Sequence, residues 1–326
     1  MGIETKFKFK SKAASLLVGV SMLAMSSTAS GLETLPEDKS MSGMKIELVG
    51  RDDLWTYKSC DNYNESPLTK SYVDAGKLPP VNERMPKEPW MAKTDQMVDG
   101  IGEYGGTFRH VIGGRPEGFN WLAGQSQGWG GINIQLMESL TRLGPLWQIK
   151  PDEANPLPNL AKDWEWSSDR KSLTMNLIEG ARWSDGDIFD TEDIDFWWND
   201  NVQDANVASR LPKDALGAGT TLEILGPYSF KFNFDEPKGN AVLAQLAYMG
   251  GAPGPSHVMK PLHPAHNSDA TYESYANGMP ASVLPIVTLG AYVPVVHKVD
   301  ELMVMKRNPY YWNCLLYTSD AADEST

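Results

Sequence analysis

PNLAKDWEWSSDRKSLTMNLIEGARWSDGDIFDTED, residues 158–193, is the stretch of sequence that decides the fold. Within it, the run SLTMNLI places Leu173, Met175 and Leu177 on one side of an extended chain and polar residues on the other. Alternation with a period of two is typical of a strand that has one buried face. We therefore expect a strand here that covers part of a hydrophobic core.

A turn and the start of a helix are expected directly after this strand. Residues 184–186 read Ser-Asp-Gly, in which a short polar side chain can bond the backbone and glycine tolerates a positive φ. Asp190 or Thr191 then supplies an N-cap acceptor, and Asp193 falls in the first helical turn. The helix is expected to continue through Ile194, Trp197, Trp198 and Val202.

This strand, turn and helix resemble the extracellular solute-binding proteins of family 5, the dipeptide and oligopeptide receptors of ABC importers. The family pattern is built around a WSDG turn and a TAED helix start, and Asp187-Ile188 stands where the family often has a proline. The residues that match the pattern are Pro158, Leu160, Ala161, Trp164, Ser167, Asp169, Thr174, Gly180, Trp183, Ser184, Asp185, Gly186, Phe189, Thr191, Glu192, Asp193 and Phe196.

Three further segments agree with the family in the same order along the chain. They are YGGTFRHVI at 104–112, YSFKFNFDEP at 228–237 and LGAYVPVVHKVDELMVMKRNPYYW at 289–312. The resemblance extends from about Leu78 to Trp312. Four ordered segments are far more specific than any single short motif.

The resemblance implies an α/β fold of the two-lobed, type II periplasmic-binding-protein kind, incomplete in this chain, with mixed sheets and flanking helices. It implies a monomeric receptor without cofactor, catalysis or bound metal, which encloses a ligand by hinge closure and delivers it to a membrane permease. Peptides are the first expected ligand class and oligosaccharides the second. The role could be import or chemosensing.

The candidate ligand-binding residues lie in a glycine-rich loop and are Gln127, Gly128 and Trp129. Trp129 stands among glycines, with no apolar periodicity that would bury it. An exposed indole offers a ligand both a stacking face and an N–H donor. In the oligopeptide receptors that this chain resembles, the loop at this place contacts the ligand backbone.

The net charge limits the classes of partner. The 326 residues carry a formal charge of -13 at pH 7. An acidic protein is repelled by nucleic acid and by an anionic membrane surface, so neither is expected as a partner. The hydrophobic fraction of 41% is ample for a packed core.

The N-terminus has the pattern of a secretory signal peptide over residues 1–30. Lys6, Lys8, Lys10 and Lys12 form a positive region, and an apolar run from Ala13 to about Met25 follows. That run is shorter than the ~20 residues of a membrane span, which makes a transmembrane anchor the weaker alternative. Since no cysteine lies near the cleavage region, we expect a soluble periplasmic protein rather than a lipoprotein.

The remaining chain divides into three parts. Residues 31–103 form a polar, proline-containing segment, here called the lead, which is expected to be an extended linker or a segment that lies along the protein surface. Residues 104–313 form the N-terminal portion of the solute-binding domain, a discontinuous lobe with an inserted subdomain at about 131–221. The strand 107–112 would open the domain, a helix would run through Ile132, Leu136, Leu140 and Leu143, and an amphipathic strand would follow at 228–234.

Residues 314–326 are expected to be foreign to the natural protein. CLLYTSDAADE, which begins at Cys314, looks like a translation of the transposon-end and adapter sequence of DNA sequencing libraries. The alternative is a divergent C-terminus rich in small and acidic residues. If the adapter reading holds, Cys60 is an unpaired thiol, and the second wall of the ligand clamp would follow Asn313. The chain would then bind ligand poorly and leave apolar residues such as Leu302 and Val304 exposed.

Catalytic and metal motifs are weak. GQSQG, with Gly124, Ser126 and Gly128, spells a nucleophile elbow, but the strand-turn-helix context is poor. A secreted hydrolase, for instance a glycosidase with paired carboxylates, is the alternative from another functional class.

Two clusters could suggest a metal. The acidic run at 185–193 lacks the glycine and the final glutamate of an EF-hand loop, so a turn with an N-cap explains it more simply. His257, His263 and His266 have no fixed secondary structure to support zinc binding, and a solvated loop is the simpler interpretation.

Signal cleavage gives the first testable prediction. Cleavage should fall within about three residues of Ala29 and leave a soluble chain. Mass spectrometry of periplasmic extract measures the mature N-terminus. Retention of Lys6 to Lys12, or a lipid on Cys60, would contradict the prediction.

Overall fold

The computed structural model describes residues 48, 50, 55–57, 63–92, 105–111, 113–127, 131–143, 149–150, 155–247, 249–280 and 282–313. The predicted signal peptide and the predicted foreign tail lie outside these residues. In chain order the described elements are β1 (Trp55–Tyr57), α3 (Pro67–Asp74), α4 (Val81–Arg84), β2 (Trp90–Ala92), the 3-10 helix η3 (Trp121–Ala123), α5 (Ile132–Leu136), β3 (Thr141–Arg142), β4 (Leu157–Pro158), β5 (Ala161–Trp166), β6 (Ser172–Leu177), α6 (Thr191–Asp195), the π-helix η6 (Phe196–Val202), β7 (Thr221–Gly226), β8 (Ser229–Asn233), α7 (Ala241–Gln245), the 3-10 helix η7 (Met249–Gly251), α8 (Ser256–Met259), the 3-10 helix η8 (Lys260–Leu262), α9 (Tyr272–Ala276), β9 (Tyr292–Lys298) and β10 (Leu302–Arg307).

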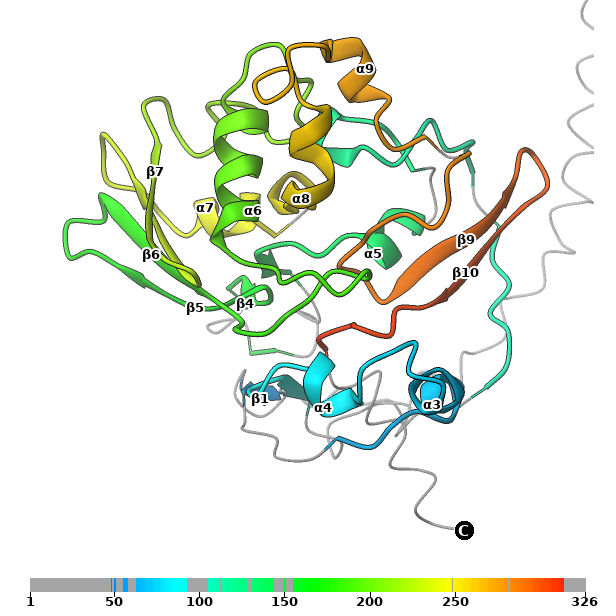
Figure 1. Ribbon diagram of the computed structural model, residues 1–326. Helices are drawn as coiled ribbons and strands as arrows, with labels where there is room; N and C mark the ends of the chain where they lie inside the picture. The colour runs from blue at the N-terminus through cyan, green and yellow to red at the C-terminus, as the bar shows by residue number, and fades with distance from the viewer. Residues whose placement is uncertain are drawn as a thin grey trace, which may run out of the picture. The chain divides into compact units, whose positions relative to one another are not determined.

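A four-stranded antiparallel sheet holds the strand that the sequence predicts. The strand order is β5-β6-β8-β7, and β6 pairs with both β5 and β8 (Figure 1). In β6, Leu173, Met175 and Leu177 are buried while the alternate residues are partly exposed. Across the β6–β8 ladder, Phe232 lies opposite Leu173 and Phe230 opposite Met175. Both predicted amphipathic strands are therefore confirmed, and they share one buried face.

The helix predicted after the turn covers this buried face (Figure 1). It begins as α6 and continues as η6, a widened π-helix that contains Trp197 and Trp198. Trp198 is buried and its ring meets Phe232 of β8 edge-on, with the centroids 4.9 Å apart. The predicted course through Val202 is confirmed, whereas the switch from α to π geometry had no signal in the sequence.

An antiparallel hairpin of β9 and β10 follows late in the chain (Figure 1). Val296 faces Val304 across the ladder, and the register shifts after Val304. Leu302 is 45% exposed and Val304 40% exposed. The expected exposure of these apolar side chains is confirmed.

Two predicted elements differ in the structure. Residues 107–111 form no strand, and Phe108 and Val111 are each 90% exposed. A strand needs a hydrogen-bonded neighbour, and none of the described residues supplies one there. The helix predicted through Leu143 ends at Leu136, because Met137 is extended and the chain then enters β3.

The described part of the predicted lead is folded rather than extended. Residues 63–92 contain α3 and α4, and Val81, Met85 and Trp90 are buried. The buried guanidinium of Arg84 forms an ion pair with Glu65 and also donates to the Pro309 carbonyl. This packing has no local signal in the sequence, because the apolar residues follow no helical or strand period.

No helix in the described ranges combines the length and the apolar character that a membrane crossing requires. The proposed division of 104–313 into a discontinuous lobe and an inserted subdomain stays a prediction. The four-stranded sheet itself runs from Ala161 to Asn233.

Packing of the tryptophan pair gives the second prediction. Trp198→Ala should lower the free energy of unfolding by about 3–5 kcal/mol, the usual cost of removing a buried tryptophan. Urea denaturation followed by circular dichroism measures it. Leu68→Ala on α3, where the side chain is 57% exposed, is the control and should change stability by less than about 0.5 kcal/mol. Equal effects of the two substitutions would contradict the packing.

Candidate functional site

The turn predicted at Ser184–Gly186 is present and requires its glycine. Trp183 donates its backbone N–H to the Asp187 carbonyl at 2.8 Å, and Gly186 donates back to the Trp183 carbonyl at 2.9 Å. Gly186 has a φ of 98°, and a Cβ added there would lie 3.0 Å from the Tyr310 hydroxyl. Both the backbone conformation and the close approach of Tyr310 favour glycine.

The helix start after the turn is a capping box. Asp190 is the N-cap residue, and its carboxylate accepts the Glu192 N–H at 2.7 Å. Asp193 completes the box by accepting the Asp190 N–H at 3.4 Å. Thr191, the other predicted cap, instead donates its hydroxyl to the Gly226 carbonyl at 2.8 Å. The acidic run thus acts as a turn and a cap, as the sequence predicts.

Asp193 connects three segments through one buried carboxylate. Its Oδ2 accepts the indole N–H of Trp183 at 3.0 Å, and its Oδ1 accepts the backbone N–H of Ser256 at 2.8 Å. Burial raises the pKa of Asp193 to about 6, although the hydrogen bonds from Trp183 and Ser256 act in the opposite direction. The carboxylate therefore joins the turn, α6 and α8.

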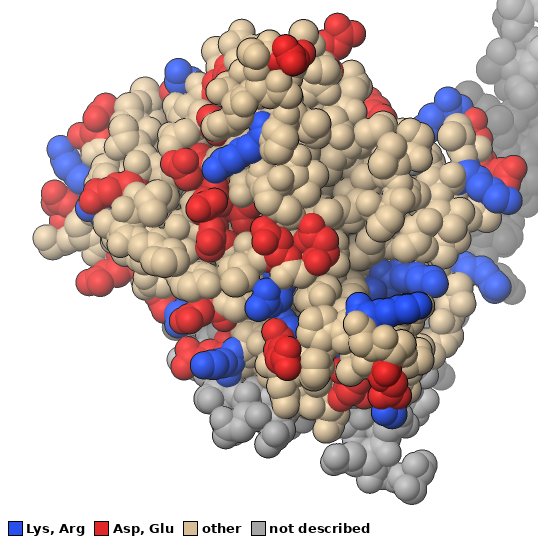
Figure 2. All heavy atoms as spheres, viewed as in Figure 1, with Lys and Arg blue, Asp and Glu red and all other residues tan. Residues whose placement is uncertain are grey.

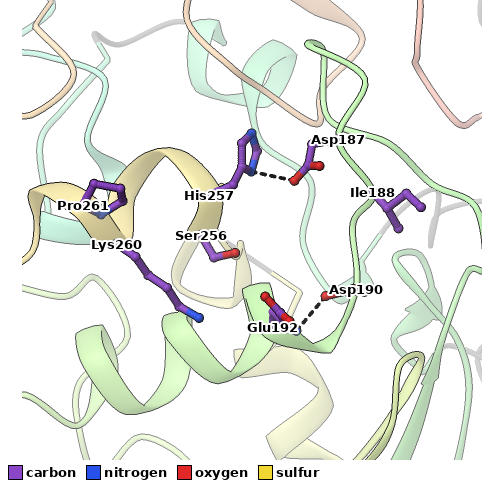
Figure 3. Close-up of a pocket in the computed structure, with 8 residues that line it drawn as sticks. All are labelled: Asp187, Ile188, Asp190, Glu192, Ser256, His257, Lys260 and Pro261. Atoms are coloured by element: carbon purple, nitrogen blue, oxygen red, sulfur yellow. Dashed lines mark hydrogen bonds and ion pairs between the residues drawn. The ribbon is translucent and has the colours of Figure 1, made fainter. Parts of the chain in front are cut away.

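His257 forms a second connection between α8 and the turn (Figure 3). Its Nε2 lies 2.8 Å from Asp185 Oδ2, and its Nδ1 lies 3.1 Å from Asp187 Oδ2. The ring also packs beside the Trp183 indole, with the centroids 6.4 Å apart. We call the contact of His257 with Asp185 and Asp187 the histidine clamp.

A hollow of about 390 Å³ lies beside the histidine clamp. Acidic side chains crowd the surface next to α6 and α8 (Figure 2). In Figure 3 the Lys260 side chain extends towards Glu192 across the hollow. The lining residues are Asp187, Ile188, Asp190, Glu192, Ser256, His257, Lys260 and Pro261.

The hollow brings a serine next to a histidine, but their contacts do not form a nucleophile and base pair. Both ring nitrogens of His257 face carboxylates. Ser256 is held by Asp193 through its backbone N–H and its side chain. A general base needs a free ring nitrogen within reach of the hydroxyl, and His257 offers none.

The loop that contains the predicted ligand residues is anchored to distant parts of the chain. The Asn120 side chain donates to the Tyr275 carbonyl at 2.7 Å, and the Phe119 N–H donates to the Met279 carbonyl at 2.8 Å. Arg210 donates to the Gln125 carbonyl at 2.7 Å. Because two separate segments hold it, one at α9 and Met279 and the other at Arg210, the described part of this loop is positioned by the fold.

The predicted ligand residues differ in what the structure describes. The Gln127 side chain is buried, and its amide N–H groups donate to the carbonyls of Gly118 and Gln125. The side chain therefore closes the loop on itself and does not face solvent. Gly128 and Trp129 lie outside the described residues. Gly128 is also the last residue of the predicted elbow, and the described part of that motif follows a 3-10 helix instead of a strand.

The three histidines do not form a metal site. His266 pairs with Asp200 at 2.7 Å, and His257 belongs to the histidine clamp. His263 is fully buried against the ring of Tyr275, so the expectation of a solvated loop is wrong at this position. Burial lowers the pKa of His263. Among the described residues, no cluster of three or more His, Cys, Asp or Glu could hold a metal ion.

Sequence reasoning missed the histidine clamp. His257 is 72 residues away from Asp185, and no local pattern links them. The available signal was the repeated carboxylate at Asp185 and Asp187, which places two acceptors on one side of a tight turn.

The comparison with protein families identifies the class of the chain. The model of the bacterial extracellular solute-binding proteins, family 5, matches residues 155–323, which include the turn, the capping box and the histidine clamp. The chain belongs to family 5. The resemblance seen in the sequence is confirmed.

Two similar proteins of this family bind sugars according to their names. The periplasmic alpha-galactoside-binding protein of Rhizobium meliloti is 47% identical over 303 residues, which cover 92% of this chain and 44% of that protein. The periplasmic binding protein MelB of Agrobacterium fabrum C58, solved in complex with stachyose, is 46% identical. Its structure matches 82% of this chain and 41% of its own with a TM-score of 0.79.

A peptide receptor of the family is a more distant match. The oligopeptide-binding protein OppA is 28% identical and covers 78% of this chain and 39% of its own, with a TM-score of 0.59. This family 5 chain spans less than half the length of these relatives. It has part of the type II periplasmic-binding-protein fold, as predicted.

The buried carboxylate gives the third prediction. Because the pKa of Asp193 rises from 3.8 to about 6 on folding, the folded state favours the protonated form. The contribution of protonated Asp193 to the free energy of unfolding is complete below about pH 3.8 and is lost as the pH rises through about 6. Relative to Asp193→Asn, wild type should lose about 2 kcal/mol of unfolding free energy between about pH 4.5 and pH 7.

Urea denaturation at a series of pH values measures this difference. Glu192→Gln, which removes an exposed carboxylate from the same helix, is the matched control. A constant stability difference between wild type and Asp193→Asn across this range would show that the carboxylate is not desolvated as described.

Proposed function

We propose that the protein is a periplasmic receptor of an ABC importer that captures an α-galactoside oligosaccharide. The observation that carries this proposal is the 47% identity to the alpha-galactoside-binding protein, which extends over almost the whole chain. From the sequence, peptides are the first expected ligand class and oligosaccharides the second. The greater similarity to the two sugar-binding relatives than to the oligopeptide receptor supports the reverse order.

The anchored loop is the part of the described structure that we assign to ligand binding. Its hydrogen bonds to Tyr275, Met279 and Arg210 fix the chain up to Gln127. A loop that is already ordered before the ligand binds loses less conformational entropy on binding, so less of the interaction energy is offset by ordering. Such anchoring suits a site that distinguishes one sugar from another by the positions of its hydroxyl groups.

Three groups on this loop are the proposed ligand contacts. Because the Gln127 side chain is used inside the loop, its backbone is the part left to meet a ligand. The Gly128 backbone would add a polar contact without a side chain in the way. The Trp129 indole would stack against the apolar face of a galactosyl ring and donate one hydrogen bond.

Delivery would follow from closure of the receptor on its ligand. A ligand shifts the balance between open and closed forms only by its different affinity for the two. The closed form would be the one that a membrane permease receives. Export of the receptor would rest on the signal peptide at 1–30. On this proposal the activity is binding without catalysis.

The fourth prediction tests the ligand class by calorimetry of the full-length protein. Stachyose should bind with roughly micromolar or tighter affinity. Sucrose, which lacks the α-galactosyl units of stachyose, and trialanine should give no heat of tight binding. Binding of trialanine without binding of stachyose would contradict the proposal and favour a peptide receptor.

The role of the loop is tested by two matched substitutions. Trp129→Ala should weaken stachyose binding about tenfold, which corresponds to ~1.4 kcal/mol and the usual value of an aromatic contact. Tyr72→Ala removes another aromatic side chain, 51% exposed on α3, and should leave the affinity unchanged. An unchanged affinity in Trp129→Ala would remove this residue from the proposed site.

A further inference from the structure

The histidine clamp joins two segments that are far apart in the sequence. His257 lies in α8 (Ser256–Met259), and Asp185 and Asp187 belong to the turn that precedes α6. The same turn also exchanges two hydrogen bonds with Thr288. Ser184 donates its backbone N–H to the Thr288 carbonyl at 2.9 Å, and Thr288 donates its backbone N–H to the Ser184 hydroxyl at 3.0 Å. The position of the turn therefore affects both α8 and the chain at Thr288.

The geometry of the clamp requires a particular protonation state of the ring. Each ring nitrogen of His257 lies within 3.1 Å of a carboxylate oxygen. A doubly protonated imidazolium donates from both nitrogens, whereas a neutral imidazole donates from one and presents a lone pair at the other. In the neutral form one of the two carboxylates would face that lone pair, so one of the two contacts would be lost.

We propose that the histidine clamp is a pH-sensitive latch, which holds the turn at 183–187 against α8 when His257 is protonated and loosens when the proton is lost. The latch belongs to the folded chain itself and does not depend on which solute the protein binds.

The charges around His257 favour the protonated form. Asp185 and Asp187 face it from the turn, and Asp193 faces it from α6. Asp190 and Glu192 line the same hollow, and Lys260 is the one lysine among the lining residues. Burial lowers the pKa of His257, but the hydrogen bond and charge of Asp185, together with Asp187 and Asp193, outweigh it and hold the pKa above its ordinary value.

The partner carboxylate shifts in the direction that an ion pair requires. Burial alone would raise the pKa of Asp185, yet the hydrogen bond from His257 holds it below its ordinary value. Because the pKa of His257 is raised in the folded chain, the latch contributes fully below the ordinary histidine pKa of about 6.5. Its contribution is lost as the pH rises through the higher folded value.

The fifth prediction tests this latch by nuclear magnetic resonance of the full chain between about pH 5.5 and pH 8.5. Both ring nitrogens of His257 should carry protons at the acid end, and the titration midpoint should lie above about 6.5. Asp187→Asn, which keeps the contact with Asp185, should lower this midpoint. A midpoint at or below about 6.5 in wild type would overturn the proposal.

Amide hydrogen exchange shows whether the proton controls the turn. Protection of the Ser184 and Thr288 amides, corrected for the intrinsic pH dependence of exchange, should fall about tenfold across the His257 midpoint, as expected when one charge-assisted hydrogen bond is lost. His257→Gln should abolish this dependence. The control His266→Gln removes a histidine that pairs with Asp200 and should leave it intact. Flat protection in wild type, or an unchanged dependence in His257→Gln, would overturn the latch.

Discussion

The described structure depends on one buried carboxylate, that of Asp193. A carboxylate that leaves water is unstable unless donors surround it, and here an indole N–H, a backbone N–H of α8 and the N–H of the helix cap supply them. These donors come from Trp183, Ser256 and Asp190. Since they belong to separate segments, satisfying the carboxylate fixes the turn, α6 and α8 in one arrangement.

The turn extends this arrangement to the late part of the chain. Ser184 exchanges hydrogen bonds with Thr288, and Gly186 lets Tyr310 approach closely. The helix capped by Asp190 continues into η6, where Trp198 packs against Phe232 of the sheet. A short motif of strand, turn and capped helix thus positions the elements around it. The proposed ligand loop is held separately, by α9 and by Arg210.

The sequence predicted the features that have local causes. The alternation of Leu173 and Met175 and a helix cap at Asp190 or Thr191 are both predicted from the sequence and confirmed, with Asp190 as the cap, because each feature is specified within a few residues. The pairing of His257 with Asp185 could not be read, since it depends on tertiary packing between distant segments. The strand expected at 107–112 is not formed over residues 107–111 for a related reason: a strand forms only beside a hydrogen-bonded partner, and the local sequence does not specify one.

Native-state hydrogen exchange at increasing denaturant concentration tests most directly whether Asp193 holds three segments as one unit. The amides of Gly186 in the turn, Ser256 at the start of α8 and Phe196 after α6 each make a described hydrogen bond. If the carboxylate joins these segments, the three amides should exchange through one opening with the same free energy and denaturant dependence. Separate openings, with the Ser256 amide exposed while Gly186 and Phe196 stay protected, would contradict the account.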